Sequence, residues 1–129
     1  MPKPLKSLVL GNSPIFSPKR VTLNVQSPLY EKRIGFLGSS ITYGAAALGN
    51  SFVDYLQAKD GVIVNKSAIS GTTLAGFSPK TYVSRLQTDF NLNSRFDAFV
   101  CQLSTNDGRA HKEIGQISDT DSYDCDTTI

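Results

Sequence analysis

The chain has 129 residues, of which 40% are hydrophobic and 19% are charged, a composition typical of one globular domain rather than a disordered or fibrous protein. The formal net charge is only +2. The basic residues of the first 33 positions are spread out and do not alternate with aromatic residues, which favours a solvated face over a nucleic-acid site: Lys3, Lys6, Lys19, Arg20, Lys32 and Arg33.

Several other classes of protein are disfavoured by the residues present. No apolar run approaches the length of a membrane span, and the polar start has no signal-peptide apolar region, so we expect a soluble cytoplasmic protein. One histidine and two distant cysteines do not form a zinc cluster, and we expect neither a metal nor a cofactor. Cys101, in an apolar run, is predicted to be a buried thiol, and Cys125 lies in a polar tail.

Five of the six prolines lie in the first 28 residues, and this shift in composition predicts an N-terminal extension over residues 1–33. Apolar runs at 8–10 and 14–16 flank a Gly11-Asn12 turn signal, and residues 21–25 alternate. We expect short antiparallel strands here, tied to the edge or top of the main sheet.

From residue 34 onward strands and helices are expected to alternate. Asn50 or Ser51 is predicted to cap the first helix, which ends at Gly61, and Ser78 followed by Pro79 is predicted to start the second. Its apolar stripe is Tyr82, Val83, Leu86 and Phe90, and Asn91 and Asn93 end it. The predicted strands are 34–37, 62–65 and 96–103. This pattern predicts a three-layer α/β/α fold with a parallel sheet, over residues 34–129.

The first predicted strand runs into Gly38 and then into two adjacent hydroxyls, Ser39 and Ser40. In parallel α/β folds the crevice beyond the carboxyl ends of the strands holds the site, so Ser40 is the candidate nucleophile. The segment Gly38-Ser39-Ser40-Ile41-Thr42-Tyr43-Gly44 resembles the first sequence block of the SGNH, or GDSL-like, hydrolases. Ser40 falls on the nucleophile position of that family, and Ser39 replaces its usual Asp.

Two later segments extend this resemblance in the same order. Gly71 matches the glycine of the second block, whose amide joins the oxyanion hole, and Ser104-Thr105-Asn106-Asp107 matches the third block, with Ser104 replacing a glycine. Parallel strands bring Ser40, Gly71 and Asn106 to one edge of the sheet. The resemblance implies a flavodoxin-like SGNH fold and an oxyanion hole made of the amides of Ser40 and Gly71 with the Asn106 side chain. A turn glycine and a loop-binding Asn are the alternative interpretations, and Asp107 is expected to cap a helix or loop.

The base that a serine nucleophile needs is not evident in the sequence. The only histidine, His111, has Gly108 rather than an Asp three residues before it, and we interpret it as a loop residue. The resemblance implies a late Asp-x-x-His block, so we expect residues 34–129 to be the N-terminal part of an incomplete domain. A second chain is expected to carry the C-terminal part, and these 129 residues are expected to be inactive alone.

The sequence therefore predicts a serine ester hydrolase that acts through an acyl-Ser40 intermediate on an acyl or acetyl ester. Two alternatives stay open. One is a flavodoxin-like phosphate- or nucleotide-binding module, in which residues 38–44 cradle a phosphate. The other is a hydrolase-like scaffold that binds esters or sugars without turnover.

Overall fold

In a computed structural model, which describes residues 9–10, 13–14, 17–91 and 93–116, the chain folds around a parallel sheet. Its strands are β3 (Arg33–Gly38), β4 (Ile63–Ala68) and β5 (Ala98–Cys101), with β3 at the centre. Both neighbours pair with β3 in parallel. The predicted α/β class and parallel sheet are confirmed. The order β4-β3-β5 is that of the first three strands of flavodoxin-like sheets.

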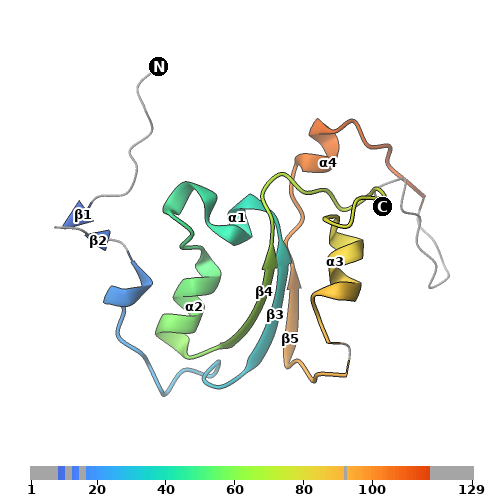
Figure 1. Cartoon of the computed structure of the whole chain (residues 1–129). Coiled ribbons are helices and arrows are strands. Elements are labelled where there is room, and N and C mark those ends of the chain that lie inside the picture. The colour runs from blue at the N-terminus through green and yellow to red at the C-terminus, as the bar shows by residue number, and fades with distance from the viewer. Residues whose placement is uncertain (1–8, 11–12, 15–16, 92, 117–129) are drawn as a thin grey trace.

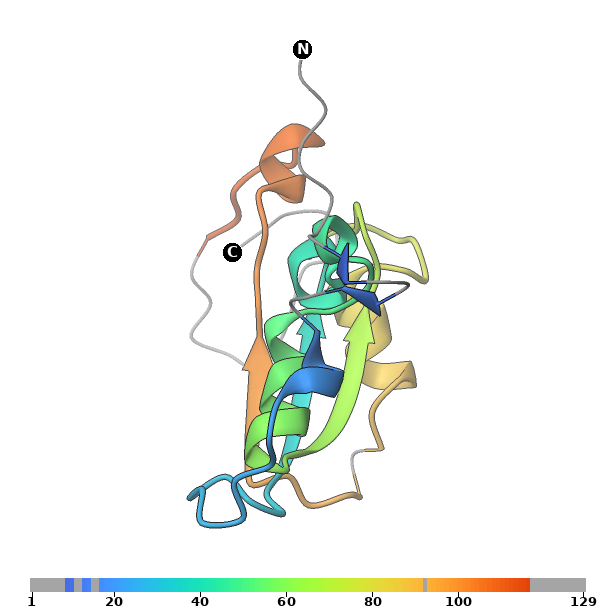
Figure 2. The same ribbon diagram turned by 90° about the vertical axis from the view of Figure 1, so that its left-hand side faces the viewer.

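Helices lie on both sides of this sheet. The short α1 (Ser40–Tyr43) and the longer α2 (Phe52–Asp60) lie on one side, and α3 (Tyr82–Thr88) lies on the other (Figure 1). In the perpendicular view α2 crosses in front of the sheet, whose edges are β4 and β5 (Figure 2). This arrangement is compatible with a three-layer α/β/α fold.

Each face of the sheet has its own core. Ile34 and Phe36 of β3 pack with Val53 of α2 on one face, whereas Leu37 packs with Tyr82 and Phe90 on the other. Successive residues of a strand point to opposite faces, which explains why the central strand is buried on both sides. Burying one such side chain contributes about 1.5–3 kcal/mol, so β3 anchors both layers.

The strand β5 lies at an edge of the sheet, and all four of its residues are exposed. Phe99 still contacts Phe90, with ring centroids 5.0 Å apart in an edge-to-face arrangement. Cys101 is a free, exposed cysteine, so the prediction of a buried thiol was wrong. An apolar run predicts a buried strand only when another layer or strand covers it, and within the described residues no strand pairs with the outer side of β5.

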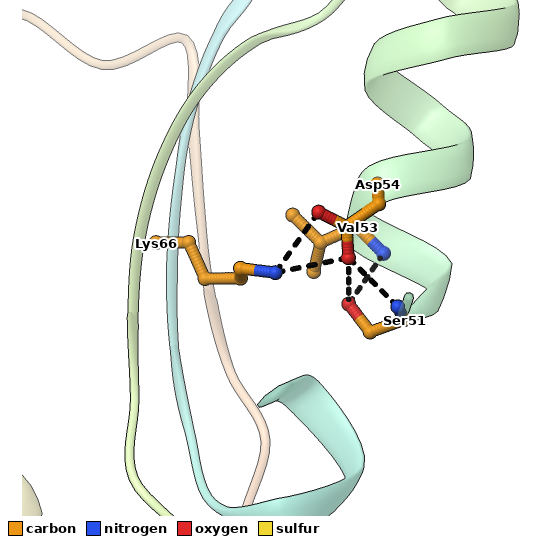
Figure 3. A network of polar contacts seen from close by, with 4 residues as sticks. All are labelled: Ser51, Val53, Asp54 and Lys66. Carbon is orange, nitrogen blue, oxygen red and sulfur yellow. Dashed lines mark hydrogen bonds and ion pairs between the residues drawn. The ribbon is translucent and has the colours of Figure 1, made fainter. Parts of the chain in front are cut away.

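The ends of α2 are those that the sequence predicted. Ser51 is the N-cap: its hydroxyl accepts from the Val53 amide, while its own amide donates to the Asp54 carboxylate at 2.7 Å. Gly61 ends the helix in the left-handed conformation, with φ of 69°. Figure 3 shows that the Asp54 carboxylate also binds Lys66 of β4, at 2.9 Å. One carboxylate therefore closes the capping box and ties α2 to the sheet.

The Asp54 network should make stability depend on pH. Burial raises the pKa of Asp54, but the Ser51 amide and Lys66 together outweigh it and hold this pKa below the ordinary value of 3.8. A depressed carboxyl pKa stabilises the fold above the unfolded value, and this contribution is lost as pH falls through the folded pKa. We expect Asp54→Asn to cost about 1 kcal/mol near neutral pH. In urea unfolding, the difference in free energy of unfolding between wild type and Asp54→Asn should shrink below about pH 4.

The variant Lys66→Met provides the control for this titration, because it removes the ion pair but leaves the capping box intact. The free energy of unfolding that Lys66→Met loses relative to wild type should also shrink in acid, but by a smaller amount than the loss of Asp54→Asn. A deficit for Asp54→Asn that stays constant from neutral pH to about pH 3 would contradict the role given to Asp54.

The second helix begins later than the sequence predicted. α3 starts at Tyr82 with Thr81 as its N-cap, so the assignment of Ser78 and Pro79 to the helix start was wrong. The Tyr82 amide donates to the Thr73 carbonyl at 2.9 Å, whereas a helix starting at Pro79 would turn it toward the carbonyl of Ser78. The helix ends at Thr88, before the predicted Asn91.

The other element boundaries differ from prediction by a few residues. β3 and β4 are longer than expected, and β5 is shorter than the predicted 96–103. These shifts do not change which strand ends carry the candidate residues.

The N-terminal prediction is correct in part. β1 (Val9–Leu10) and β2 (Ser13–Pro14) form an antiparallel pair, as expected, whereas the predicted turn at Gly11-Asn12 lies outside the described residues. This pair is a separate sheet and is not hydrogen-bonded to the main one. Residues 21–25 form no strand, because the Asn24 amide instead donates to the carbonyl of Lys59 in α2. The proposed boundary between residues 33 and 34 stays a prediction.

Within the described part of the chain, no helix is long and apolar enough to cross a membrane. Within the same residues, no three His, Cys, Asp or Glu side chains are grouped so that they could hold a metal ion. Cys125 lies outside the described residues.

Candidate functional site

Ser40 is the first residue of α1, directly beyond the carboxyl end of the central strand. The turn between them is tight: a Cβ at Gly38 would overlap the hydroxyl oxygen of Thr42. Glycine is therefore needed here so that Thr42 can fold back beneath the strand end. Ser39 is the buried N-cap residue.

The polar groups of Ser40 are available for chemistry. Its side chain is partly exposed, and its hydroxyl makes no hydrogen bond with any described residue. The Ser40 amide belongs to the first turn of α1, whose N–H groups have no partner within the helix. A free hydroxyl next to a free amide is the local arrangement that the predicted nucleophile requires.

Gly71 lies in the loop that follows β4. Its φ is +77°, the left-handed conformation that favours glycine, although a Cβ there would meet nothing within 4 Å. The turn alone is thus sufficient to explain why position 71 is glycine. The residue is exposed, and its amide has no acceptor among the described residues, as the predicted oxyanion role would need.

Asn106 begins the short α4 (Asn106–Arg109), after β5, and reaches the loop that carries Gly71. Its side-chain nitrogen donates to the carbonyl of Thr72 at 2.8 Å. This contact is the loop-binding role that was the alternative interpretation of Asn106. It also holds the amide group one residue from Gly71, with a second N–H still available to donate.

Asp107 holds the same loop. Its carboxylate accepts from the amides of Leu74, at 2.9 Å, and Ala75, at 3.1 Å. We expected Asp107 to cap a helix or loop, and it does cap backbone amides, although 32 residues or more separate it from them in the chain. Asn106 and Asp107 together therefore hold the backbone of residues 72–75 by hydrogen bonds.

A second link joins α1 to the end of β5. The Thr42 hydroxyl donates to the side-chain oxygen of Gln102. The backbone of Gln102 is fixed in turn, because its amide donates to the Leu37 carbonyl at 2.8 Å and its carbonyl accepts from the Tyr82 hydroxyl at 3.0 Å. Thr42 thus connects the helix of Ser40 to the segment that leads to Asn106.

Arg85 provides the third link, and sequence reasoning missed it. Its side chain is only 2% exposed, and one terminal nitrogen donates to both the Gly38 carbonyl and the Thr72 hydroxyl at 3.0 Å. The other terminal nitrogen donates to the hydroxyl of Ser67. The guanidinium therefore ties the end of β3 to the end of β4 and the loop beyond it.

Among the residues that the structure describes, no carboxylate forms an ion pair with Arg85. Burial lowers the pKa of its guanidinium, against the opposing influence of Tyr82 and Asp89. The Ser67 hydroxyl bridges Arg85 and Asp89: it accepts a hydrogen bond from the guanidinium and donates one to the Asp89 carboxylate at 2.5 Å. An arginine stays charged under such conditions, so each of its hydrogen bonds is charge-assisted.

A signal for Arg85 was present in the sequence, since it lies three residues after Tyr82 and so on the same helix face. The prediction placed Leu86 on the buried stripe instead, but Leu86 is exposed. A buried arginine is rare unless it is paired, which is why the apolar neighbour was preferred.

Hydrogen bonds thus link the three segments that follow β3, β4 and β5 and carry Ser40, Gly71 and Asn106. Thr42 links α1 to Gln102, Asn106 links α4 to Thr72, and Arg85 links Thr72 to Gly38. These contacts support the expectation that the three strand ends meet at one edge of the sheet. The catalytic roles of Ser40, Gly71 and Asn106 themselves stay predictions.

His111 does not complete the site within the described residues. It follows α4, is exposed, has φ of +53°, and makes no hydrogen bond with Ser40. The loop position that the sequence suggested for His111 agrees with this placement.

Comparisons with known proteins address the fold alone. No protein-family model matches the chain, and no curated protein matches it at a significant level. A solved crystal structure is similar, with a TM-score of 0.56 and 23% identity, over 77% of this chain and 46% of that one. At this identity the likeness shows a shared fold, and this chain spans less than half the length of the matched structure.

Proposed function

We propose that this chain carries the nucleophile and the oxyanion donors of a serine ester hydrolase of the SGNH type. The observation that supports this best is the set of hydrogen bonds that link the loops carrying Ser40, Gly71 and Asn106. The free Ser40 hydroxyl lies at the end of the central strand. Asn106 follows the third strand and donates a hydrogen bond to Thr72, the residue after Gly71. In α/β sheets ligands bind at this carboxyl edge.

The proposed reaction has two steps. The Ser40 oxygen attacks the ester carbonyl carbon while a base takes the hydroxyl proton, and the carbonyl oxygen becomes negative. The amides of Ser40 and Gly71 and the side chain of Asn106 donate hydrogen bonds to that oxygen. The bond between the carbonyl carbon and the alkoxy oxygen then breaks, and the base gives its proton to the leaving alcohol. In the second step water attacks the acyl-Ser40 ester in the same way and releases the acid.

The base belongs, in this proposal, to an Asp-x-x-His segment outside these 129 residues, carried by a second chain. The exposed strand β5 supports an additional partner, because an edge strand presents unpaired N–H and C=O groups on its outer side. Phe99 and Val100 of this strand are also exposed apolar residues. A further parallel strand added at β5 would continue the flavodoxin-like order.

The test is covalent labelling of Ser40 with a fluorophosphonate ester probe, followed by peptide mapping. Imidazole is added at increasing concentration to supply the absent base, and it should accelerate labelling, since a positioned general base contributes about 10²–10⁴-fold. We expect the label on Ser40 and none on Ser40→Ala. Without imidazole the chain should react slowly.

Ser70→Ala is the matched control, because Ser70 is an exposed serine in the neighbouring loop. This variant should be labelled at the wild-type rate. If Ser40 of the folded chain stays unlabelled at every imidazole concentration, and also in a complex with the Asp-x-x-His partner, the proposal is wrong.

A phosphate-binding module is the second candidate, and one observation favours it. A polar hollow of about 260 Å³ beside Gly71 is lined by hydroxyl groups and by Lys80. Such a surface suits an anion. Protection of Ser40 from the probe by millimolar phosphate, without any imidazole acceleration, would favour this candidate over the hydrolase.

A further inference from the structure

A second hollow, of about 540 Å³, lies beside Ser40 on the side of α2. Its walls come from α1, from the short 3₁₀ helix η2 (Ala45–Ala47) and from the start of α2. Ser40 itself is one of the lining residues. A molecule joined to the Ser40 oxygen would therefore have this space next to it.

The walls of the hollow are apolar and carry no charge. Ile41 and Phe52 expose 61% and 41% of their surface, and the three alanines of η2 lie between them. None of the lining residues is Asp, Glu, Lys or Arg. Exposed apolar groups gathered around a concave surface favour an apolar ligand, because its binding removes both surfaces from water.

The polar groups of the hollow are few. The Ser51 hydroxyl is already engaged, since it accepts from Val53 and donates to Asp54. Ser40 and Asn50 remain, and their side chains make no hydrogen bond with any described residue. The ligand that fits this pattern has an apolar body and one polar end.

The segment between α1 and α2 is held in one conformation by its backbone. The carbonyl of Gly44 accepts from the amides of Ala47 and Gly49, both at 2.9 Å, and the Asn50 amide donates to the Ala47 carbonyl. The hollow is thus preformed, which lowers the cost of ordering it around a ligand.

We infer that this hollow binds the acyl chain of the substrate, so that the esters cleaved at Ser40 are those of fatty acids rather than acetyl esters. This inference rests on the proposed function. An acetyl group has a single methyl carbon beyond its carbonyl and would leave the hollow empty. A longer chain covers Ile41, Phe52 and η2.

The test measures binding rather than turnover, so it needs neither the base nor the second chain. Sodium salts of the straight-chain acids from acetate to decanoate are titrated into the ¹⁵N-labelled chain and followed by amide shifts. All these probes carry the same charge, so their differences report the alkyl chain alone. We expect the Kd to fall about fourfold per added methylene, equivalent to 0.8 kcal/mol, until the hollow is filled. The shifting amides should be those of residues 41–52.

Ala47→Trp fills the hollow and should weaken decanoate binding about tenfold or more, whereas acetate should bind equally weakly to both proteins. The matched control is Ala110→Trp, at an exposed alanine after α4, which should bind decanoate like wild type. A second variant, Ile41→Ser, makes one wall polar and should also weaken decanoate binding.

The outcomes separate the two proposals. If decanoate binds no better than acetate, or its shifts fall outside residues 41–52, the acyl hollow is overturned, whatever the result of Ser40 labelling. If decanoate binds as expected but Ser40 is never labelled, the proposed function fails while the hollow remains a fatty-acid site.

Discussion

Replacing Arg85 by methionine should lower the free energy of unfolding by about 2–4 kcal/mol, a large effect for one side chain. Methionine fills a similar volume but donates no hydrogen bond. The carbonyl of Lys80 would lose the bond that the arginine gives it at 2.9 Å, and the Gly38 carbonyl would lose another at 3.0 Å. Urea unfolding followed by circular dichroism measures the change.

Two further variants show which property of Arg85 matters. Arg85→Lys keeps the charge but not the planar fork, so it should recover only part of the lost stability. Leu86→Met changes the next residue of the same helix, which is exposed, and should cost less than about 0.5 kcal/mol. Equal stabilities of Arg85→Met and Leu86→Met would disprove the linking role of the guanidinium.

Replacing Asn106 by alanine should slow the labelling of Ser40 by about 10²–10³-fold, the loss typical of removing one oxyanion donor. The negative oxygen formed on the phosphorus of the probe takes the place of the ester oxyanion. The measurement is the second-order rate of fluorophosphonate labelling in the presence of imidazole. Wild type and variant are compared at the same imidazole concentration.

This prediction needs a control for the structural bond that Asn106 makes to Thr72. Asp107→Ala releases the same loop at Leu74 and Ala75 without removing an oxyanion donor. It should slow labelling by less than about tenfold. If the two variants slow labelling equally, Asn106 acts only by holding the loop, and its assignment to the oxyanion hole is wrong.

The contrast between the two longer helices explains where sequence reasoning succeeded. The start of α2 depends on contacts within four residues, from Ser51 to Asp54, and such short-range signals can be read directly from the sequence. Ser78 and Pro79 offered a signal of similar quality for α3. That helix nevertheless starts at Tyr82, because the Tyr82 amide bonds to Thr73, in a loop whose position no local pattern reports.

The burial of individual residues was less predictable for the same reason. Cys101 lies in an apolar run that suggested a core strand, yet β5 is at the edge of the sheet. Whether a strand is central or at an edge depends on the partners that surround it, and the strand's own residues carry little information about them.

The amino-acid sequence alone determined that this chain forms a parallel α/β sheet and that Ser40, Gly71 and Asn106 follow its three strands. Alternating hydrophobic patterns and helix caps are local, so they can be recognised without a structure. Only the tertiary structure decided that Arg85 is buried between two strand ends and that Asn106 and Asp107 clasp residues 72–75. The physical reason is that these bonds join segments far apart in the chain, and each forms only after the sheet has brought its partners together.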